Sequence, residues 1–191
     1  DGGVGPGNTA FVSPAINIKG IPTSVIASAS PNPVCEFATL SLAASATGAE
    51  SWEWTGPDGF TSTLQNPVIN NISSAAAGIY TLTASNSCGS AGAVSTAFVT
   101  VNQLPVVSAG ASVCIGSTMQ LTPASGGTWT SNNAPVASVS NAGVVTGLQQ
   151  GSATFTFTDA VTGCSNTTSP VAVLPRPTAQ ITSADASICN G

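Results

Sequence analysis

Residues 141–159 read NAGVVTGLQQGSATFTFTD, and this stretch decides the fold. Its second half alternates between two sets of side chains, Ala153, Phe155 and Phe157 on one side and Thr154, Thr156 and Thr158 on the other. Successive side chains of a strand point to opposite faces, so this period of two predicts a strand with phenylalanines toward a core and threonines toward water. Gly143, Gly147 and Gly151 punctuate the stretch and predict turns around the short strands.

The composition of the whole chain agrees with an all-β fold. The long-chain helix formers Lys, Arg, Glu and Met are scarce, Ser, Thr, Val, Gly and Pro abound, and 42% of the 191 residues are hydrophobic, enough to build a core. The length allows one large domain or two small ones. Charge excludes some partners: with net charge −5 and only Lys19 and Arg176 as cations, we expect no nucleic-acid binding. The apolar runs are also far shorter than the roughly 18 residues of a membrane helix, so we expect no direct membrane insertion.

The cysteines reveal an internal repeat. NPVCEF, ASVCIG and ASICNG surround Cys35, Cys114 and Cys189, and each follows an Ile-Pro or Leu-Pro pair by about a dozen residues (Ile21-Pro22, Leu104-Pro105, Leu174-Pro175). Cysteines of this kind recur after 79 and 75 residues, a suitable length for a small β-sandwich. The repeat predicts a closing strand of a preceding repeat in 1–20, domains in 21–103 and 104–175, and an opening strand of a following repeat in 176–191.

Cys88 and Cys164 lie between these positions, each in a turn-like context after an alternating strand. The simplest pairing is Cys35–Cys88 and Cys114–Cys164, one disulfide per domain, with Cys189 unpaired in this segment. Four cysteines allow three connectivities, so the assignment depends on the repeat. Reduced thiols are a weaker alternative, and a zinc site is weaker still because the chain has no CxxC pair and no histidine. Disulfides indicate an oxidising compartment such as the periplasm, the cell surface or the medium.

Each predicted domain contains about seven short strands, which is typical of an immunoglobulin-like sandwich. In the first domain these are TSVIASAS, FATLSLAAS, SWEWTG, FTSTLQ, PVINNIS, GIYTLTASN and AVSTAFVTVN. In the second they are VVSAGA, TMQLTP, GTWTSN, VASVSN, GVVTG, SATFTFTD and TTSPVAVLP. The alternation predicts Trp54, Tyr80, Trp129 and Phe155 as the anchors of the two cores.

Both domains resemble known families. The first, with WEWTGPDGF, NPVINNIS and AGIYTLTASNSCG, is similar to the immunoglobulin- and PKD-like repeats of secreted Bacteroidota proteins. Its AGIY segment at 77–80 resembles the tyrosine corner of immunoglobulin folds, although Leu82 stands where those folds have their second cysteine. The second domain is similar to bacterial group 2 immunoglobulin-like domains. The matching residues are Trp129, Ser131, Asn132, Val136, Ala137, Val139, Gly143, Val145, Thr146, Gly147, Gly151, Ala153 and Phe155.

The residue inventory argues against catalysis. Without histidine the chain cannot build a Ser-His-Asp triad or a Cys-His pair. Glu50 and Glu53 are the closest carboxylates, but three residues apart on a strand they face opposite ways, so we interpret them as solvated positions rather than a glycosidase pair. The joints VNQLPVV and VLPRPTA contain no carboxylate for calcium. We therefore expect no catalytic, cofactor-binding or metal-binding residues and no cofactor.

Two aromatic residues remain as candidates for binding. Trp52 shares the face of Trp54 and is either a second core residue or a partly exposed one, with the core favoured. Phe60 follows the Asp58-Gly59 turn and is the better candidate for an exposed aromatic that contacts a carbohydrate. The threonine row at 154, 156 and 158 could bind ice, but it also serves simply to cover a sheet with few charges.

The resemblance implies a structural stalk or filament segment of a long bacterial adhesin, secreted or anchored at the surface. In the related proteins, tandem domains of this kind transmit force and space a distal binding region, and some take part in gliding motility after type IX secretion. It implies export through the periplasm to the cell surface. The implied partners are neighbouring repeats of the same chain, with glycans or solid surfaces as targets of adhesion. The alternative is a carbohydrate- or surface-binding module.

Overall fold

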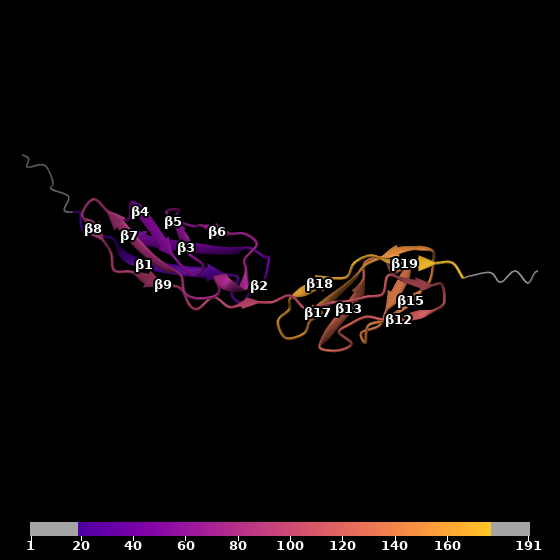
Figure 1. The fold of residues 1–191 in the computed structure, drawn as a ribbon. Coiled ribbons are helices and arrows are strands. Elements are labelled where there is room, and N and C mark those ends of the chain that lie inside the picture. The colour runs from indigo at the N-terminus through magenta and orange to yellow at the C-terminus, as the bar shows by residue number, and fades with distance from the viewer. Residues whose placement is uncertain (1–18, 177–191) are drawn as a thin grey trace, which may run out of the picture. The chain divides into compact units, whose positions relative to one another are not determined.

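The computed structural model describes residues 19–176 (Figure 1). The regular structure of this part is β-strand with one short 3-10 helix, η1 (Ser74–Ala76). The first ten strands are β1 (Thr23–Ser30), β2 (Val34–Cys35), β3 (Leu40–Thr47), β4 (Ser51–Thr55), β5 (Thr61–Ser62), β6 (Val68–Ile69), β7 (Thr81–Asn86), β8 (Gly89–Ser90), β9 (Val94–Ser95) and β10 (Val101–Asn102). The others are β11 (Ser112–Cys114), β12 (Thr118–Gln120), β13 (Gly127–Ser131), β14 (Ala137–Val139), β15 (Val144–Gly147), β16 (Gly151–Ala153), β17 (Phe155–Asp159), β18 (Ser165–Thr167) and β19 (Val171–Leu174).

The described residues form two compact units. Unit 1 comprises the residues up to Asn32 together with Thr39–Ile69 and Ala75–Val99. Unit 2 comprises Pro33–Ala38, Asn70–Ser74 and the residues from Thr100 onward. The segment that carries Cys35 therefore groups with unit 2, although it lies within the first of the two domains expected from the sequence.

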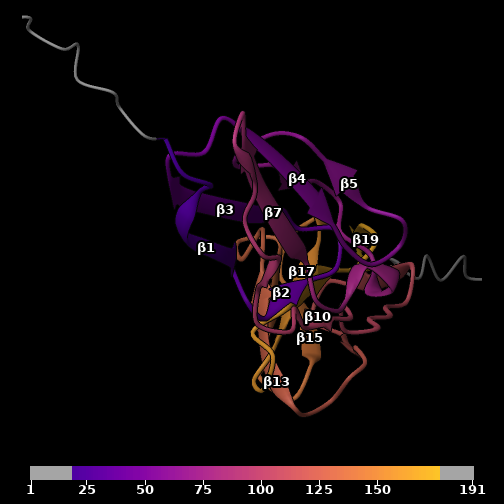
Figure 2. The same ribbon diagram turned by 90° about the vertical axis from the view of Figure 1, so that its left-hand side faces the viewer.

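Unit 1 is built from two antiparallel sheets. One has the order β1-β3-β6, and the other has the order β5-β4-β7-β8 with β9 also pairing with β7. Figure 2 shows β4 between β5 and β7 in the second sheet. In β3 every second side chain is buried from Leu40 to Ala44, which is the alternation expected for a strand with one face on a core. Trp54 on β4 lies opposite Leu82 on β7, and both are fully buried. These residues form the interior of unit 1.

Unit 2 contains three three-stranded sheets, ordered β11-β19-β16, β12-β15-β14 and β13-β17-β18. Trp129 on β13 lies opposite Phe157 on β17, with ring centroids 5.1 Å apart. The buried side chains that pack together as its core are those of Val113, Leu121, Trp129, Ala137, Val145, Ala153, Phe155, Phe157, Val171 and Val173. Unit 2 therefore has a core of its own, centred on this aromatic pair.

One buried threonine performs the same task in each unit. In unit 1 the Tyr80 amide donates to Thr96 Oγ1 at 3.2 Å, and the Thr96 amide donates to the Tyr80 carbonyl at 2.9 Å. In unit 2 the Phe155 amide donates to Thr168 Oγ1 at 3.2 Å, and the Thr168 amide donates to the Phe155 carbonyl at 2.9 Å. The threonine hydroxyl thus accepts the hydrogen bond of a buried backbone amide that has no strand partner. A buried amide left without an acceptor would destabilise the fold.

The all-β class and the tandem Ig-like arrangement are confirmed, and most expected strands are present. Residues 106–111 are an exception, because only Ser108 forms an isolated bridge, to Thr122. The expected strand 152–159 is divided at Thr154: Ala153 pairs with Val171 in one sheet, whereas Phe155 pairs with Ser131 in another. Three strands were not expected at all, β2, β8 and β11, and two of them, β2 and β11, end at a cysteine.

Candidate functional site

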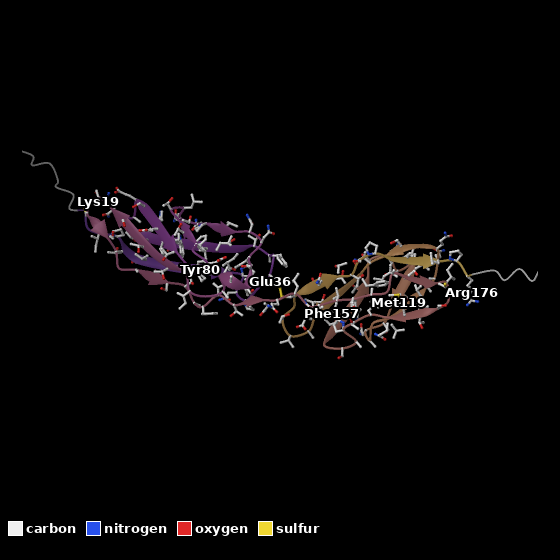
Figure 3. All side chains as sticks on the ribbon, in the orientation of Figure 1. Lys19, Glu36, Tyr80, Met119, Phe157 and Arg176 are labelled. Atoms are coloured by element: carbon white, nitrogen blue, oxygen red, sulfur yellow. A yellow bond between two sulfur atoms is a disulfide. The ribbon has the colours of Figure 1, made fainter. Side chains whose placement is uncertain are left out.

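A disulfide joins Cys35 to Cys164, which are 129 residues apart in the sequence, with a Cα–Cα distance of 5.7 Å. Both cysteines belong to unit 2. Cys35 ends β2, which runs parallel to β10, and Cys164 is buried between β17 and β18. Figure 3 shows the sulfur–sulfur bond beside the labelled Glu36.

This bond corrects the predicted pairing. Cys88 and Cys114, expected to bond to Cys35 and Cys164, are both free thiols. The pairs Cys35–Cys88 and Cys114–Cys164 are therefore not formed, and the described part of the chain has one disulfide instead of one per domain. Cys189 lies outside the described residues.

The reason for the first correction is the length of β1. The Cys88 thiol lies 3.0 Å from the carbonyl oxygen of Lys19, just before β1 begins. Cys35 follows the far end of that strand, whose eight residues span about 26 Å at 3.3 Å per residue. Disulfide bonding requires Cα atoms within roughly 7 Å, so these two cysteines cannot meet.

The second pair is separated in the same way. Cys114 lies opposite Leu174 in the parallel pair of β11 and β19, and the preceding residue of β19, Val173, lies opposite Gly151. From Gly151 the chain runs through β16 and β17 before it reaches Cys164. The nine residues of β16 and β17, from Gly151 to Asp159, cover about 25–30 Å, again beyond the reach of a disulfide.

The hairpin that carries Cys164 is organised by Asp159. Its Oδ1 accepts the amides of Val161 and Thr162 at 3.0 and 2.8 Å and the Thr162 hydroxyl at 3.0 Å. These donors favour the charged carboxylate, with the Thr162 amide contributing most, and they lower the pKa of Asp159 below its ordinary value. The Thr162 hydroxyl in turn accepts the Cys164 amide at 3.2 Å, so the carboxylate orients the disulfide-bonded residue through one neighbour.

The hairpin that carries Cys88 is organised by different groups. Asn86 Oδ1 accepts the Cys88 amide at 2.9 Å, and Glu50 accepts the Ser87 amide at 3.1 Å. Glu50 also forms an ion pair with Lys19, and this partner, followed by the Ser87 amide, lowers the pKa of Glu50 below its ordinary value. Glu50 thus stabilises the turn beside Cys88 through its hydrogen bond with the Ser87 amide.

The four expected anchors are buried. Trp54, Tyr80 and Phe155 have no exposed area, and Trp129 is 4% exposed. The Tyr80 hydroxyl donates to the Ala76 carbonyl, four residues upstream, at 2.8 Å, which is the geometry of a tyrosine corner.

The expected binding aromatics are only partly accessible. Trp52 is half-buried, and Phe60 is half-buried with its ring edge-to-face on Tyr80 at a centroid distance of 5.5 Å. Two other aromatics are more exposed, Phe37 at 65% and Phe98 at 60%. Sequence reasoning missed both; Phe37 has a φ of 63°, and the strand expected around Phe98 is interrupted there.

Among residues 19–176 no cluster of three His, Cys, Asp or Glu side chains could hold a metal ion. In the same residues no helix has the length and apolarity needed to cross a membrane.

Comparison with known families identifies the C-terminal part. Residues 95–169 match the family model of the bacterial Ig-like domain (group 2). This region is a group 2 bacterial Ig-like domain. Domains of this family are typically non-catalytic, and together with the disulfide the group 2 Ig-like domain indicates an extracytoplasmic location.

Three solved structures match the chain over about four fifths of its length. Murine CEACAM1b is 13% identical with a TM-score of 0.38, over 80% of this chain and 100% of that one. The three N-terminal domains of the Highly Immunogenic Outer Capsid protein (Hoc) of bacteriophage RB49 are 12% identical with a TM-score of 0.39, over 82% and 71%. Sidekick-1 immunoglobulin domains 1–4 are 14% identical with a TM-score of 0.31, over 82% and 50%. No curated protein matches the chain.

Tandem Ig-like domains are typical of surface and extracellular proteins. The group 2 Ig-like domain and the disulfide place this chain in that broad class.

Proposed function

We propose that this chain is a force-bearing stalk segment of a long bacterial surface adhesin, with Ig-like repeats in 21–103 and 104–175. The observation that carries the proposal is the Cys35–Cys164 disulfide, which connects positions in these two repeats. A covalent bond between the two repeats limits how far the chain extends under load, which suits a spacer. The similarity of the sequence to repeats of gliding-motility adhesins extends the proposal to gliding.

The disulfide defines a path for tension. Force that enters through β1 reaches Cys35, crosses the disulfide to Cys164, and leaves through β18 and β19. The chain between the two cysteines contains β3 to β17 and with them most of both cores. These strands lie inside a covalent loop and carry no load along the chain.

Single-molecule pulling between residues 19 and 176 tests this path. Because Cys35 and Cys164 are 129 residues apart, about 430–460 Å of contour length should stay hidden under oxidising conditions and be released after reduction. A Cys35→Ser variant should release this length in either condition, while Cys88→Ser should behave like the unmodified chain. Release of the full length by the oxidised, unmodified chain would contradict the proposal.

The alternative role, a carbohydrate- or surface-binding module, predicts specific binding on a glycan array. The exposed side chains of Phe37 and Phe98 are the positions at which Ala substitutions should then abolish binding. A stalk segment should give no specific signal before or after these substitutions.

A further inference from the structure

Two cysteines of the described chain are free, and each has a disulfide-bonded counterpart. Cys35 and Cys114 end the strands β2 and β11, and we call them strand cysteines. Cys88 and Cys164, which lie in the β7–β8 and β17–β18 hairpins, are called hairpin cysteines. One strand cysteine is bonded to one hairpin cysteine, and the other two are free.

The two strand cysteines have matching surroundings. Cys35 lies opposite Asn102 in a parallel strand pair, and the amide after it, of Glu36, donates to the Asn102 carbonyl at 2.8 Å. Cys114 lies opposite Leu174 in a parallel pair, and the amide after it, of Ile115, donates to the Leu174 carbonyl at 2.9 Å.

The match extends to each side of these cysteines. Buried valines precede both, Val34 and Val113, and both cysteine carbonyls accept an amide three residues on, from Ala38 at 3.2 Å and from Ser117 at 3.0 Å. Cys35 and Cys114 are also both half-buried. The free strand cysteine, Cys114, thus has the same strand pairing and the same backbone hydrogen bonds as the bonded one, Cys35.

The two hairpin cysteines also match. A side-chain oxygen two residues upstream accepts the amide of each, from Asn86 to Cys88 and from Thr162 to Cys164. Each hairpin is tied to the peptide that leads into its own repeat: Asn86 Nδ2 donates to the Gly20 carbonyl at 2.9 Å, and Asn166 Nδ2 donates to the Pro105 carbonyl at 3.0 Å.

A separate contact shows what Cys88 faces. Its thiol lies 3.0 Å from the Lys19 carbonyl. Lys19 stands two residues before Ile21-Pro22, as Asn102 stands two residues before Leu104-Pro105, and Asn102 is the residue opposite Cys35. Lys19 and Asn102 therefore occupy equivalent positions in successive repeats. Asn102 lies opposite the bonded cysteine Cys35, and Lys19 lies beside the free thiol of Cys88.

We propose that Cys88 and Cys114 are covalent docking sites for neighbouring Ig-like repeats. Each strand cysteine bonds to the hairpin cysteine of the repeat that follows it, as Cys35 does with Cys164. Cys88 accepts the strand cysteine of a preceding repeat, and Cys114 bonds to the hairpin cysteine of a following one. The partner is thus an Ig-like repeat with a cysteine of the complementary type, and the result is a ladder of disulfides between successive repeats.

The bond forms by thiol–disulfide exchange with a donor disulfide, such as that of an extracytoplasmic thiol oxidase. The thiolate of one cysteine attacks a donor sulfur and gives a mixed disulfide, and the donor's other sulfur leaves as a thiolate. The thiolate of the complementary cysteine then attacks the mixed disulfide and releases the donor as a dithiol. The two protons pass to the solvent or the donor thiols, and the donor is reduced as the two cysteines are oxidised. The exposed thiol of Cys88 is accessible to such a donor.

A head-to-tail fusion tests the ladder. Leu174 of one copy is joined directly to Gly20 of a second copy, so that Leu174 takes the place of Lys19. The fusion is expressed in an oxidising compartment, free thiols are alkylated, and the chain is digested with pepsin, because Lys19 and Arg176 leave trypsin almost no cleavage sites. Disulfide-linked peptides are then identified by mass spectrometry without reduction.

We expect a peptide that links Cys114 of the first copy to Cys88 of the second, with loss of alkylation at both. Cys35–Cys164 should form within each copy and reports correct folding. In the matched control, Cys88→Ser in the second copy alone, Cys114 of the first copy should become alkylated while both Cys35–Cys164 bonds remain. Alkylation of Cys114 and the second Cys88 in a fusion with both Cys35–Cys164 bonds would overturn the inference, and so would any Cys35–Cys88 or Cys114–Cys164 bond or the failure of Cys35–Cys164 to form. The inference does not rest on a force-bearing role, and failure at Cys114 would leave the pulling experiment on Cys35–Cys164 unaffected.

Discussion

Unit 1 and unit 2 share one backbone contact at a buried aromatic residue but differ in the side-chain contacts of that residue. Thr96 and Thr168 bind the backbone of Tyr80 and Phe155 in the same way. Tyr80 adds a hydroxyl that reaches the Ala76 carbonyl, whereas Phe155 has no polar group. The aromatic contact of unit 2 is between the tilted rings of Trp129 and Phe157. In unit 1 it is the edge-to-face contact of Phe60 with Tyr80. The contact between a buried threonine and the backbone is therefore common to both units, whereas the side-chain contacts of Tyr80 and Phe155 differ.

The largest expected effect comes from removing the aromatic pair of unit 2. Trp129→Ala should lower the free energy of unfolding of unit 2 by about 3–5 kcal/mol, since it deletes a buried ring and leaves a cavity. It also removes the indole N–H that donates to the Pro123 carbonyl at 2.8 Å. Urea unfolding followed by the NMR amide signals of unit 2 measures the loss, because the remaining tryptophans, Trp52 and Trp54, lie in unit 1. Trp52→Ala is the control: its side chain is half-buried, and a loss as large as that of Trp129→Ala would contradict a special role for the pair.

A smaller effect should isolate the difference between the units. Tyr80→Phe removes only the hydroxyl and makes unit 1 resemble unit 2 at this position. The Ala76 carbonyl then loses its 2.8 Å partner in a buried setting, so unit 1 should lose about 1–3 kcal/mol. Chemical denaturation of the Tyr80→Phe and Phe155→Leu variants would test this, with the second expected to affect unit 2 alone. An unchanged midpoint for Tyr80→Phe would mean that the tyrosine corner does not stabilise unit 1.

The smallest effect concerns the Cys164 hairpin and pH. The pKa of Asp159 is lowered in the folded chain, chiefly by the Thr162 amide, so its contribution to stability is complete above the pKa of the unfolded chain. That contribution should disappear as the pH falls through the lowered value. An NMR titration should show the amide shifts of Val161 and Thr162 following this acid transition, and Asp159→Asn should abolish it. Amide shifts that stay constant through the acid range in the unmodified chain would contradict the assignment.

Much of the fold could be predicted because the signal is local. The alternation at 151–159 and in β3 predicts which side chains are buried, and Phe155, Phe157, Leu40 and Leu42 are buried. The division of the strand at Thr154 could not be predicted, because the same alternation continues while the chain passes from one sheet to the other. The strands β2 and β11 were missed because their pairing is parallel with residues more than 55 positions away.

The sequence by itself determined the all-β class, the repeat of its cysteines, the buried aromatics and the similarity to group 2 Ig-like domains. These features depend on side-chain alternation and spacing along the chain. Only the tertiary structure decided which cysteines bond. The sequence shows that Cys35 and Cys88 belong to one repeat, but an eight-residue strand keeps them apart, and the hairpin of Cys164 brings its sulfur to Cys35 instead. A disulfide requires closeness in space, and closeness along the chain does not provide it when a strand of about 26 Å intervenes.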